Sequence, residues 1–229
     1  MERLNYRAAA TATGKGAGVV VKALLLGVTL LALPLSASAW TALVVGDSIG
    51  AAYKLKEEDG WVRLTEAALR ERYPDADVEL VNASISGDTT RGGLSRLPDA
   101  LERFEPDLVV IELGGNDGLR GYPPASMRQN IEAMARLSDE AGAEVLILGM
   151  MIPSNYGAAF TKMFSDAFGE AAEATDSALV PFLLEPIAED RTWFQSDGIH
   201  PTAEAQPLLV EHVLPAFETE LEAHLEETS

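Results

Sequence analysis

The sequence predicts an α/β fold, a single α/β/α sandwich built on a parallel sheet of about five strands. Three observations lead to this prediction. The expected strands are nearly continuous apolar runs, which is typical of strands that are buried on both faces. Segments with the apolar spacing of helices separate them, as parallel strands require. The chain has 229 residues, 47% of them hydrophobic, which suits one domain with a sizeable core.

Five apolar runs predict the strands. The clearest is "DLVVIEL", because branched aliphatic residues fill its centre and favour extended backbone. The other runs also lack the alternation of apolar and polar residues that marks a half-exposed sheet. In chain order the expected strands lie at 41–46, 78–81, 107–113, 144–150 and 178–182.

Five further segments have apolar residues spaced for helices. In the first, Trp61, Leu64 and Leu69 fall on one face, and Pro74 follows its end. We expect Pro98 near the start of the second helix and Pro207 in the first turn of the last one, where proline is tolerated. In chain order the expected helices lie at 60–73, 94–104, 126–141, 160–175 and 205–225.

The first 39 residues predict a secretory signal peptide. A basic start precedes the 13-residue apolar run "ALLLGVTLLALPL", which is too short for a comfortable membrane span. The "SASA" that follows offers a cleavage site before Trp40. We therefore expect a signal peptide at 1–39 and one secreted domain at 40–229. No stable membrane span is expected after cleavage; the alternative is an uncleaved N-terminal anchor.

The composition excludes several classes of function. The formal net charge is −19, and such a surface repels nucleic acid and anionic membranes, so we expect no nucleic-acid partner. The acidity fits either a saline habitat or ordinary solubility. The chain has no cysteine, which excludes disulfides, cysteine-based zinc sites and a catalytic thiol. No ligand cluster points to a metal, and no cofactor is expected.

Small and polar residues follow four of the expected strands. Sites in parallel α/β sheets form beyond the carboxyl ends of the strands, so these segments should lie on one edge. They read "GDSIG", "SISGD", "GGNDG" and "PSNYG". Each of them alone is also ordinary turn chemistry.

Ser48 is the candidate nucleophile. The stretch "VVGDSIG" fits G-x-S-x-G, the nucleophile elbow of α/β-hydrolases. Those enzymes place the serine in mid-chain, with the acid and the histidine on separate loops. Here Ser48 follows the first strand, and the candidate acid and base share one short loop. The match therefore predicts a nucleophile without predicting that family.

His200 is the candidate base. His212 and His224 lie among glutamates of the last expected helix and read as solvated surface residues. In "SDGIHP", Asp197 precedes His200 by three residues, and in a turn this spacing lets the carboxylate reach the Nδ1–H group. The second ring nitrogen is then left as a base. A hydrogen-bonded loop pair without a catalytic role would have the same spacing.

Together these segments resemble the SGNH (GDSL) hydrolase family, from Trp40 to the last helix. "ISGDTT", "ELGGNDGLRG", "SNYG" and "DGIHPTAEAQP" are similar to the periplasmic acyl-CoA thioesterase I / lysophospholipase L1 / arylesterase group. Ile49 stands where the family name has leucine, and Gly115 is at a freely varying position. The matching blocks are, in order, "GDSIG" with Ser48, "SGD" with Gly87, "GGND" with Asn116, and "DGIHP" with Asp197 and His200.

The resemblance implies a flavodoxin-like sandwich and a serine esterase that needs no metal. Ser48 would attack an acyl carbonyl, His200 would take its proton, and Asp197 would fix the imidazole. The main-chain N–H groups of Ser48 and Gly87, with the Asn116 side chain, would form the oxyanion hole. The implied substrates are small molecules: aryl or alkyl esters, acyl thioesters and lysophospholipids. The oligomeric state stays open.

Two other functions and two further features also stay open. A carbohydrate O-deacetylase would use the same triad with a polar groove, and a lipid- or glycan-binding module would lack catalysis. The complete set of serine, aspartate and histidine argues against the binding module. The apolar stretches 119–124 and 150–153 either line an acyl-chain groove or pack in the core. Asp88 and Asp117, beside the oxyanion-hole candidates, are expected to brace their turns.

Overall fold

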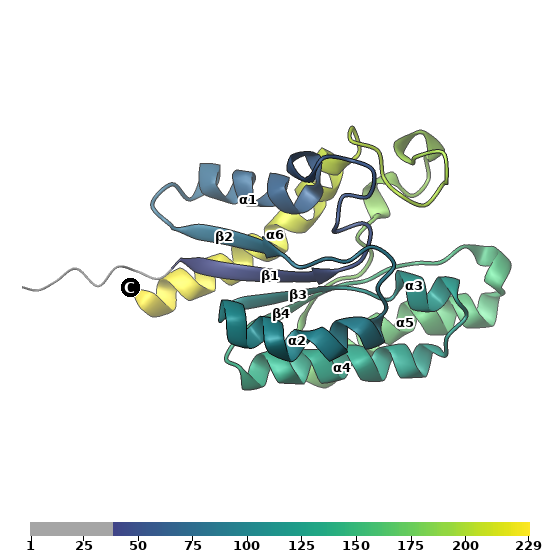
Figure 1. Cartoon of the computed structure of the whole chain (residues 1–229), viewed down its shortest axis with the longest axis horizontal. Coiled ribbons are helices and arrows are strands. Elements are labelled where there is room, and N and C mark those ends of the chain that lie inside the picture. The colour runs from purple at the N-terminus through teal and green to yellow at the C-terminus, as the bar shows by residue number, and fades with distance from the viewer. Residues whose placement is uncertain (1–38) are drawn as a thin grey trace, which may run out of the picture. The chain divides into compact units, whose positions relative to one another are not determined.

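A computed structural model describes residues 39–229, and they form one parallel sheet between helices (Figure 1). The strand order is β2-β1-β3-β4-β5, and every neighbouring pair is parallel. The predicted α/β fold with five parallel strands is therefore confirmed. The predicted signal peptide falls on residues outside the described part, apart from residue 39, and stays a prediction. The strands are β1 (Trp40–Gly46), β2 (Val78–Asn82), β3 (Leu108–Glu112), β4 (Glu144–Leu148) and β5 (Ala178–Val180).

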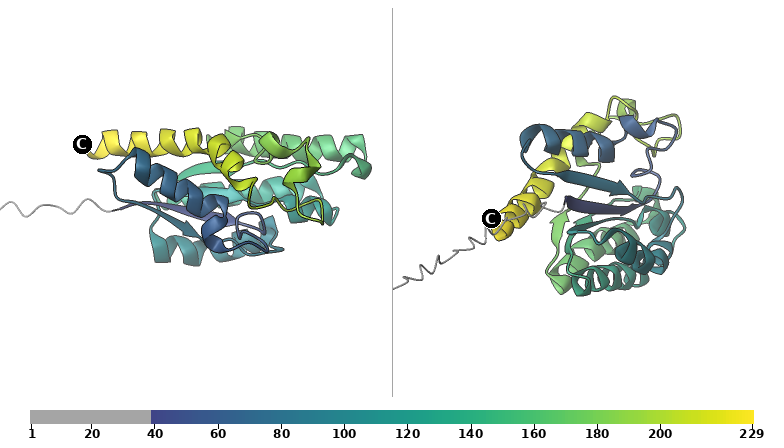
Figure 2. Two further views of the ribbon diagram at one scale, coloured as in Figure 1. Left: turned by 90° about the horizontal axis from the view of Figure 1, so that it is seen from above. Right: turned by 60° about the vertical axis from the view of Figure 1, so that its left-hand side comes forward.

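Helices cover both faces of this sheet (Figures 1 and 2). Helices α1 (Trp61–Arg72) and α6 (Gln206–Thr228) pack against each other on one face. Helices α2 (Thr90–Phe104), α4 (Pro124–Glu140) and α5 (Ala158–Thr175) lie side by side on the other. Within residues 39–229, no helix combines the length and the apolar character that crossing a bilayer requires.

The sheet has a separate hydrophobic core on each face. Alternate residues of β1 show this division, because Ala42 and Val44 join the core beneath α1 and α6, whereas Leu43 and Val45 join the other. All four of these side chains are fully buried. A strand that is buried on both faces has no polar side to expose, and this is why its sequence reads as an unbroken apolar run.

The structure differs from the sequence prediction at two helices. Helix α2 begins at Thr90, four residues before the predicted start, because the Thr89 side chain caps it by accepting the Gly92 N–H. Pro98 therefore lies inside the helix, and the prediction that it lies near the start is wrong. The "GGNDG" segment, expected as a turn, is the short helix α3 (Gly115–Leu119). It can begin directly after β3 because Gly114 adopts a φ of 128°.

Replacing two glycines by alanine should change the stability of the fold in opposite directions. Gly149 follows β4, and a Cβ there would overlap the carbonyl oxygen of Pro181. Gly149→Ala should therefore lower the free energy of unfolding by about 1–3 kcal/mol. A Cβ at Gly169, within α5, would meet nothing within 4 Å, so Gly169→Ala should raise stability by about 0.5–1 kcal/mol. Urea unfolding of both variants checks this, and equal effects would contradict the close approach at Gly149.

Candidate active site

Ser48 lies in a turn of residues 46–50, here called the nucleophile turn, directly after β1. The Glu112 carboxyl from the neighbouring strand enters this turn, and its Oε2 accepts the N–H groups of Asp47 and Gly50, both at 3.0 Å. A Cβ on Gly50 would lie 2.8 Å from this oxygen, and one on Gly46 would overlap it. The Ser84 hydroxyl lies comparably close to both positions, so the Glu112 carboxyl and Ser84 together require the two glycines and give the G-x-S-x-G spacing a physical cause of its own.

Ser48, His200 and Asp197 form one chain of hydrogen bonds, and its Asp197–His200 half is the contact that their spacing predicts. The Ser48 Oγ lies 2.8 Å from His200 Nε2, and His200 Nδ1 lies 3.0 Å from Asp197 Oδ2. The other Asp197 oxygen accepts the main-chain N–H groups of Ile199 at 3.0 Å and His200 at 3.1 Å. One carboxylate therefore both shapes the loop and orients the imidazole. The hydrogen bond from the main-chain N–H of His200 is the main reason that the pKa of Asp197 falls to about 2.

Gln195 connects the His200 loop to the segment that follows the nucleophile turn. Its main-chain N–H donates to the His200 carbonyl at 2.7 Å, and its side-chain Nε2 donates to the Tyr53 carbonyl at 2.9 Å. The Tyr53 ring lies against the His200 imidazole, with 4.3 Å between ring centroids. Ala52 and Lys54, on either side of Tyr53, have φ values of 51° and 58°, a strained conformation for these residues. Sequence reasoning missed this connection.

Gly87 and Asn116 face the same cavity as Ser48 and His200, and this cavity measures about 390 Å³. Gly87 has a φ of 82°, and its N–H donates to no acceptor within residues 39–229. The Asn116 Nδ2 donates one hydrogen to Asp47 Oδ2 at 3.0 Å, which leaves its second amide hydrogen free. The structure thus gathers every residue predicted for the site.

Asp47 and Glu112 are the residues of this site that the sequence reasoning did not single out. Asp47 Oδ1 accepts the Ile49 N–H at 3.0 Å, and Oδ2 accepts from Asn116. Burial raises the pKa of both carboxyls, and the nearby charge of Asp47 raises that of Glu112 further. A signal was present, because an acid within the apolar run "DLVVIEL" is costly to bury without a purpose.

Asp88 and Asp117 brace the turns, as expected. The Asp117 carboxylate accepts the main-chain N–H of Thr90 at 2.9 Å and its Oγ1–H at 2.7 Å, which joins α3 to the start of α2. Asp88 pairs with Arg96 at 2.8 Å. Arg120 donates from Nη2 to the Gly87 carbonyl at 2.8 Å, and this contact supports the loop that carries Gly87.

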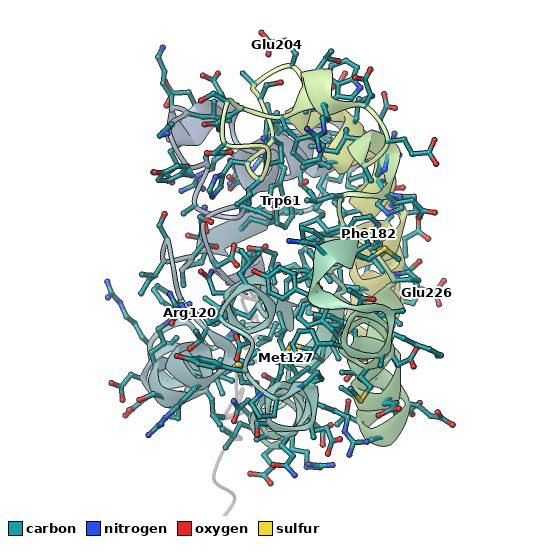
Figure 3. The ribbon with its side chains drawn as sticks, turned by 90° about the vertical axis from the view of Figure 1, so that its right-hand side faces the viewer. Trp61, Arg120, Met127, Phe182, Glu204 and Glu226 are labelled. Atoms are coloured by element: carbon teal, nitrogen blue, oxygen red, sulfur yellow. The ribbon has the colours of Figure 1, made fainter. Side chains whose placement is uncertain are left out.

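An apolar groove of about 270 Å³ adjoins the catalytic cavity. Figure 3 views the molecule from this edge, with Phe182 on the groove side and Arg120 on the side of Gly87. The stretch 150–153 lines the groove, and of the stretch 119–124 only Leu119 does. The two cavities share Ile49, Gly115, Leu119 and Ile199.

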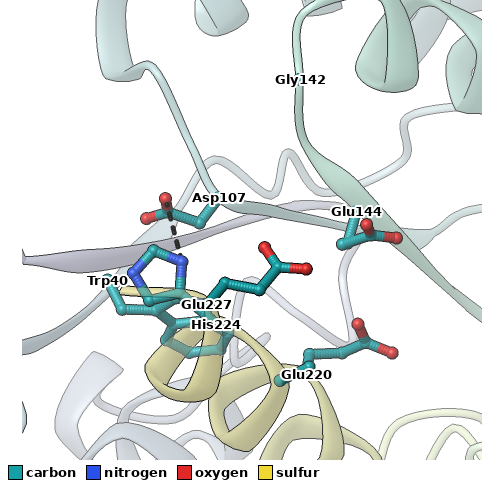
Figure 4. Close-up of a pocket in the computed structure, with 8 residues that line it drawn as sticks. Trp40, Asp107, Gly142, Glu144, Glu220, His224 and Glu227 are labelled. Atoms are coloured by element: carbon teal, nitrogen blue, oxygen red, sulfur yellow. Dashed lines mark ion pairs between the residues drawn. The ribbon is translucent and has the colours of Figure 1, made fainter. Parts of the chain in front are cut away.

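The other two histidines lie away from Ser48. His224 lines an acidic cavity of about 120 Å³ with Trp40, and its Nδ1 lies 3.6 Å from Asp107 (Figure 4). Trp40 begins β1, so this cavity is at the opposite edge of the sheet. His212 donates from Nε2 to the Phe182 carbonyl at 3.0 Å. Both are half-buried and not solvated as predicted. No cluster of three or more histidines and acids suited to a metal ion occurs in the described part of the chain.

Comparison with known proteins relates this geometry to ester hydrolases. The profile of the GDSL-like lipase/acylhydrolase family matches residues 44–207. Esterase TesA of Pseudomonas aeruginosa is 48% identical over 86% of this chain and 98% of its own. The thioesterase 1/protease 1/lysophospholipase L1 of Escherichia coli is 38% identical over 77% and 82%. The crystal structure of the psychrotrophic esterase EstA from Pseudoalteromonas sp. is 39% identical, with a TM-score of 0.75 over 80% of this chain and 99% of that one.

Proposed function

Because the chain belongs to the GDSL-like lipase/acylhydrolase family and is a hydrolase of ester bonds, we propose that it cleaves acyl esters and thioesters through an acyl-enzyme on Ser48. The observation that carries this proposal is the unbroken path from Ser48 Oγ through the His200 ring to Asp197. A serine hydroxyl is a weak nucleophile until a base takes its proton. His200 is in hydrogen-bond contact with it, and Asp197 holds the ring in place.

The reaction follows from these positions. Ser48 Oγ attacks the carbonyl carbon while His200 Nε2 takes the hydroxyl proton. When the tetrahedral intermediate collapses, Nε2 returns that proton to the departing oxygen or sulfur, and the acyl group stays on Ser48. A water molecule then attacks the acyl-enzyme, with His200 again as the base. Asp197, whose pKa of about 2 keeps it ionised at neutral pH, stabilises the imidazolium in both halves of the reaction.

The proposed oxyanion hole consists of the N–H groups of Ser48 and Gly87 and the Nδ2 of Asn116. Two observations support it. The Gly87 N–H is without an acceptor among the described residues, and Asp47 orients the Asn116 amide by taking only one of its hydrogens. These donors are fixed before the substrate binds, so they stabilise the negative charge of the transition state without reorganisation.

The groove supports an apolar acyl chain as the group transferred to Ser48. Methionine, isoleucine, leucine and phenylalanine line it, and such side chains bind hydrocarbon well. A carbohydrate O-deacetylase would need a polar groove, so this alternative is not favoured. The intact hydrogen-bonded triad argues against a binding module without catalysis.

The leader sequence supports export of this esterase across the inner membrane, with residues 40–229 as the mature domain in the periplasm or outside the cell. The partner of the site is a small-molecule ester. The strongly acidic composition makes nucleic acid an unsuitable partner.

Ser48→Ala tests the nucleophile directly. The variant should lose hydrolysis of p-nitrophenyl butyrate and labelling by a fluorophosphonate, with an unchanged melting temperature, because only one oxygen atom is removed. Ser86→Ala is the matched control, since Ser86 lines the same cavity and should leave the label on Ser48. If Ser48→Ala kept more than about a tenth of the wild-type kcat, the nucleophile assignment would be wrong.

Asn116 tests the oxyanion hole. Asn116→Ala should lower kcat by about 10²-fold or more with little change in KM, because the donor acts mainly in the transition state. Asn116→Asp should be at least as damaging, since its carboxylate would face that of Asp47. Steady-state kinetics and melting temperatures of both variants decide the matter. An active and equally stable Asn116→Asp enzyme would exclude Asn116 from the oxyanion hole.

Ala188 tests the groove. It lines the part of the groove that is not shared with the catalytic cavity, so Ala188→Phe should fill the space for a long chain. We expect kcat/KM for p-nitrophenyl palmitate to fall about tenfold or more relative to the acetate. Ala125→Phe, in a separate hollow beside Pro124, is the control and should leave the ratio unchanged. An unaltered ratio in Ala188→Phe would place the acyl chain elsewhere.

A further inference from the structure

Glu112 is a buried acid without an ion-pair partner. It ends β3, and its exposed fraction is 0%. Among residues 39–229 no lysine, arginine or histidine contributes to its ionisation, whereas Asp47 opposes it. A buried carboxylate without a cation costs several kcal/mol. The carboxyl must therefore have some other means of staying in the core.

The hydrogen bonds of Glu112 match those of a neutral carboxylic acid. Oε2 accepts two main-chain N–H groups, from Asp47 and Gly50, both at 3.0 Å. Oε1 has no hydrogen-bond partner in the described part of the molecule. A protonated carboxyl accepts through one oxygen and carries its hydrogen on the other, so Oε1 is the oxygen that is free to carry a proton.

Asp47 is the neighbouring carboxyl, and it is equipped to hold the negative charge. Both of its oxygens accept hydrogen bonds, from the Ile49 N–H and from the Asn116 amide, each at 3.0 Å. When His200 carries the proton taken from Ser48, its imidazolium adds a favourable charge interaction with Asp47. Two adjacent buried carboxyls cannot both ionise cheaply. The pair therefore divides into an ionised Asp47 and a protonated Glu112.

Among the described residues, no other charged group beside Glu112 is available to neutralise its carboxyl. Arg96 donates to the Gly46 carbonyl at 3.3 Å, but its charge is paired with Asp88. Both carboxylate oxygens of Asp117 accept hydrogen bonds from Thr90. Ser84 is uncharged, although its hydroxyl lies against Gly46 and Gly50 beside the Glu112 carboxyl.

We propose that Glu112 is a positioning residue that works in its protonated form. The neutral carboxyl holds the nucleophile turn through two N–H groups, and it leaves Asp47 free to carry the charge that orients Asn116. This inference rests on the proposed roles of Ser48 and Asn116. Loss of the proton would place a second negative charge inside the turn, where it opposes both the turn and the oxyanion. Activity should therefore decline at alkaline pH because Glu112 ionises.

The proton that we assign to Glu112 should also make the stability of the fold depend on pH. Burial and the charge of Asp47 raise the pKa of Glu112 well above its ordinary value. For an acid whose pKa is higher in the folded state, the stabilising contribution is complete below the unfolded pKa, about 4.3. It is lost as the pH rises from there towards the folded pKa. A neutral isostere at this position should thus gain stability over the wild type as pH increases.

Glu112→Gln is that isostere, since its amide oxygen can accept both N–H groups. We expect its kcat at pH 7 to stay within about threefold of wild type. The alkaline decline in kcat should move up by at least one pH unit, and the melting temperature relative to wild type should increase from pH 5 to pH 9. Glu112→Ala removes the acceptor and should lower kcat about tenfold or more at every pH, with KM little changed.

Glu66→Gln is the matched control. Glu66 is also buried, but Arg63 at 2.8 Å and Arg70 at 2.7 Å pair with it. Glu66→Gln weakens both ion pairs, so it should lower the melting temperature without moving the pH profile of kcat. A general effect of removing a buried acid would shift both variants alike, and that result would contradict the proposal for Glu112.

Two results with Glu112→Gln would overturn the inference. One is a pH profile and a pH dependence of melting temperature that both equal those of wild type, which would show that Glu112 does not titrate in this range. The other is a loss of kcat at pH 7 as large as in Glu112→Ala, which would show that the ionised form is needed. Either result leaves labelling at Ser48 intact, so failure of this inference is distinct from failure of the proposed function.

Discussion

Two hydrogen bonds from the N–H groups of Asp47 and Gly50 to the Glu112 carboxyl connect the nucleophile turn to β3. The rest of the site depends on this connection. It requires glycine on both sides of Ser48, because a Cβ there would meet the carboxyl. It also leaves Asp47 facing Asn116. The proposed nucleophile Ser48 and the oxyanion-hole candidate Asn116 therefore belong to one hydrogen-bonded unit at the ends of two adjacent strands.

His200, the proposed base, reaches this unit from 152 residues away in the chain. Asp197 organises its loop locally, but a local turn cannot place the imidazole against Ser48. Gln195 helps to hold the His200 loop against the segment after the nucleophile turn, because its side chain donates to the Tyr53 carbonyl. Gln206, at the start of α6, accepts the Trp61 N–H at 2.9 Å and thereby joins α6 to the first turn of α1. These contacts bring the last third of the chain to the first strand.

Charge and apolar surface are distributed differently on this molecule. The chain as a whole is strongly acidic, which keeps it soluble and repels anionic partners. Of the large apolar side chains that remain exposed in the described part, Tyr53 and Ile199 line the cavity of Ser48, and Met151 and Ile199 line the adjoining groove. This arrangement suits a substrate with a hydrocarbon chain. The exposed side chains are Tyr53, Ile85, Tyr122, Met151, Tyr156, Met163 and Ile199.

The sequence by itself determined the fold class, because parallel strands buried on both faces must be apolar runs and must be separated by crossovers. It also singled out Ser48 by its place after the first strand and His200 by its spacing from Asp197, whereas the role of Asn116 was implied by the family resemblance. The tertiary structure decided what local patterns do not encode. The start of α2 depends on a cap at Thr89, and the spacing around Ser48 depends on Glu112. The contacts that dock the His200 loop, and the divided protonation that we infer for Asp47 and Glu112, depend on groups far apart in sequence. The physical reason is that hydrogen bonding and desolvation depend on distance in space, which the order of residues specifies only after folding.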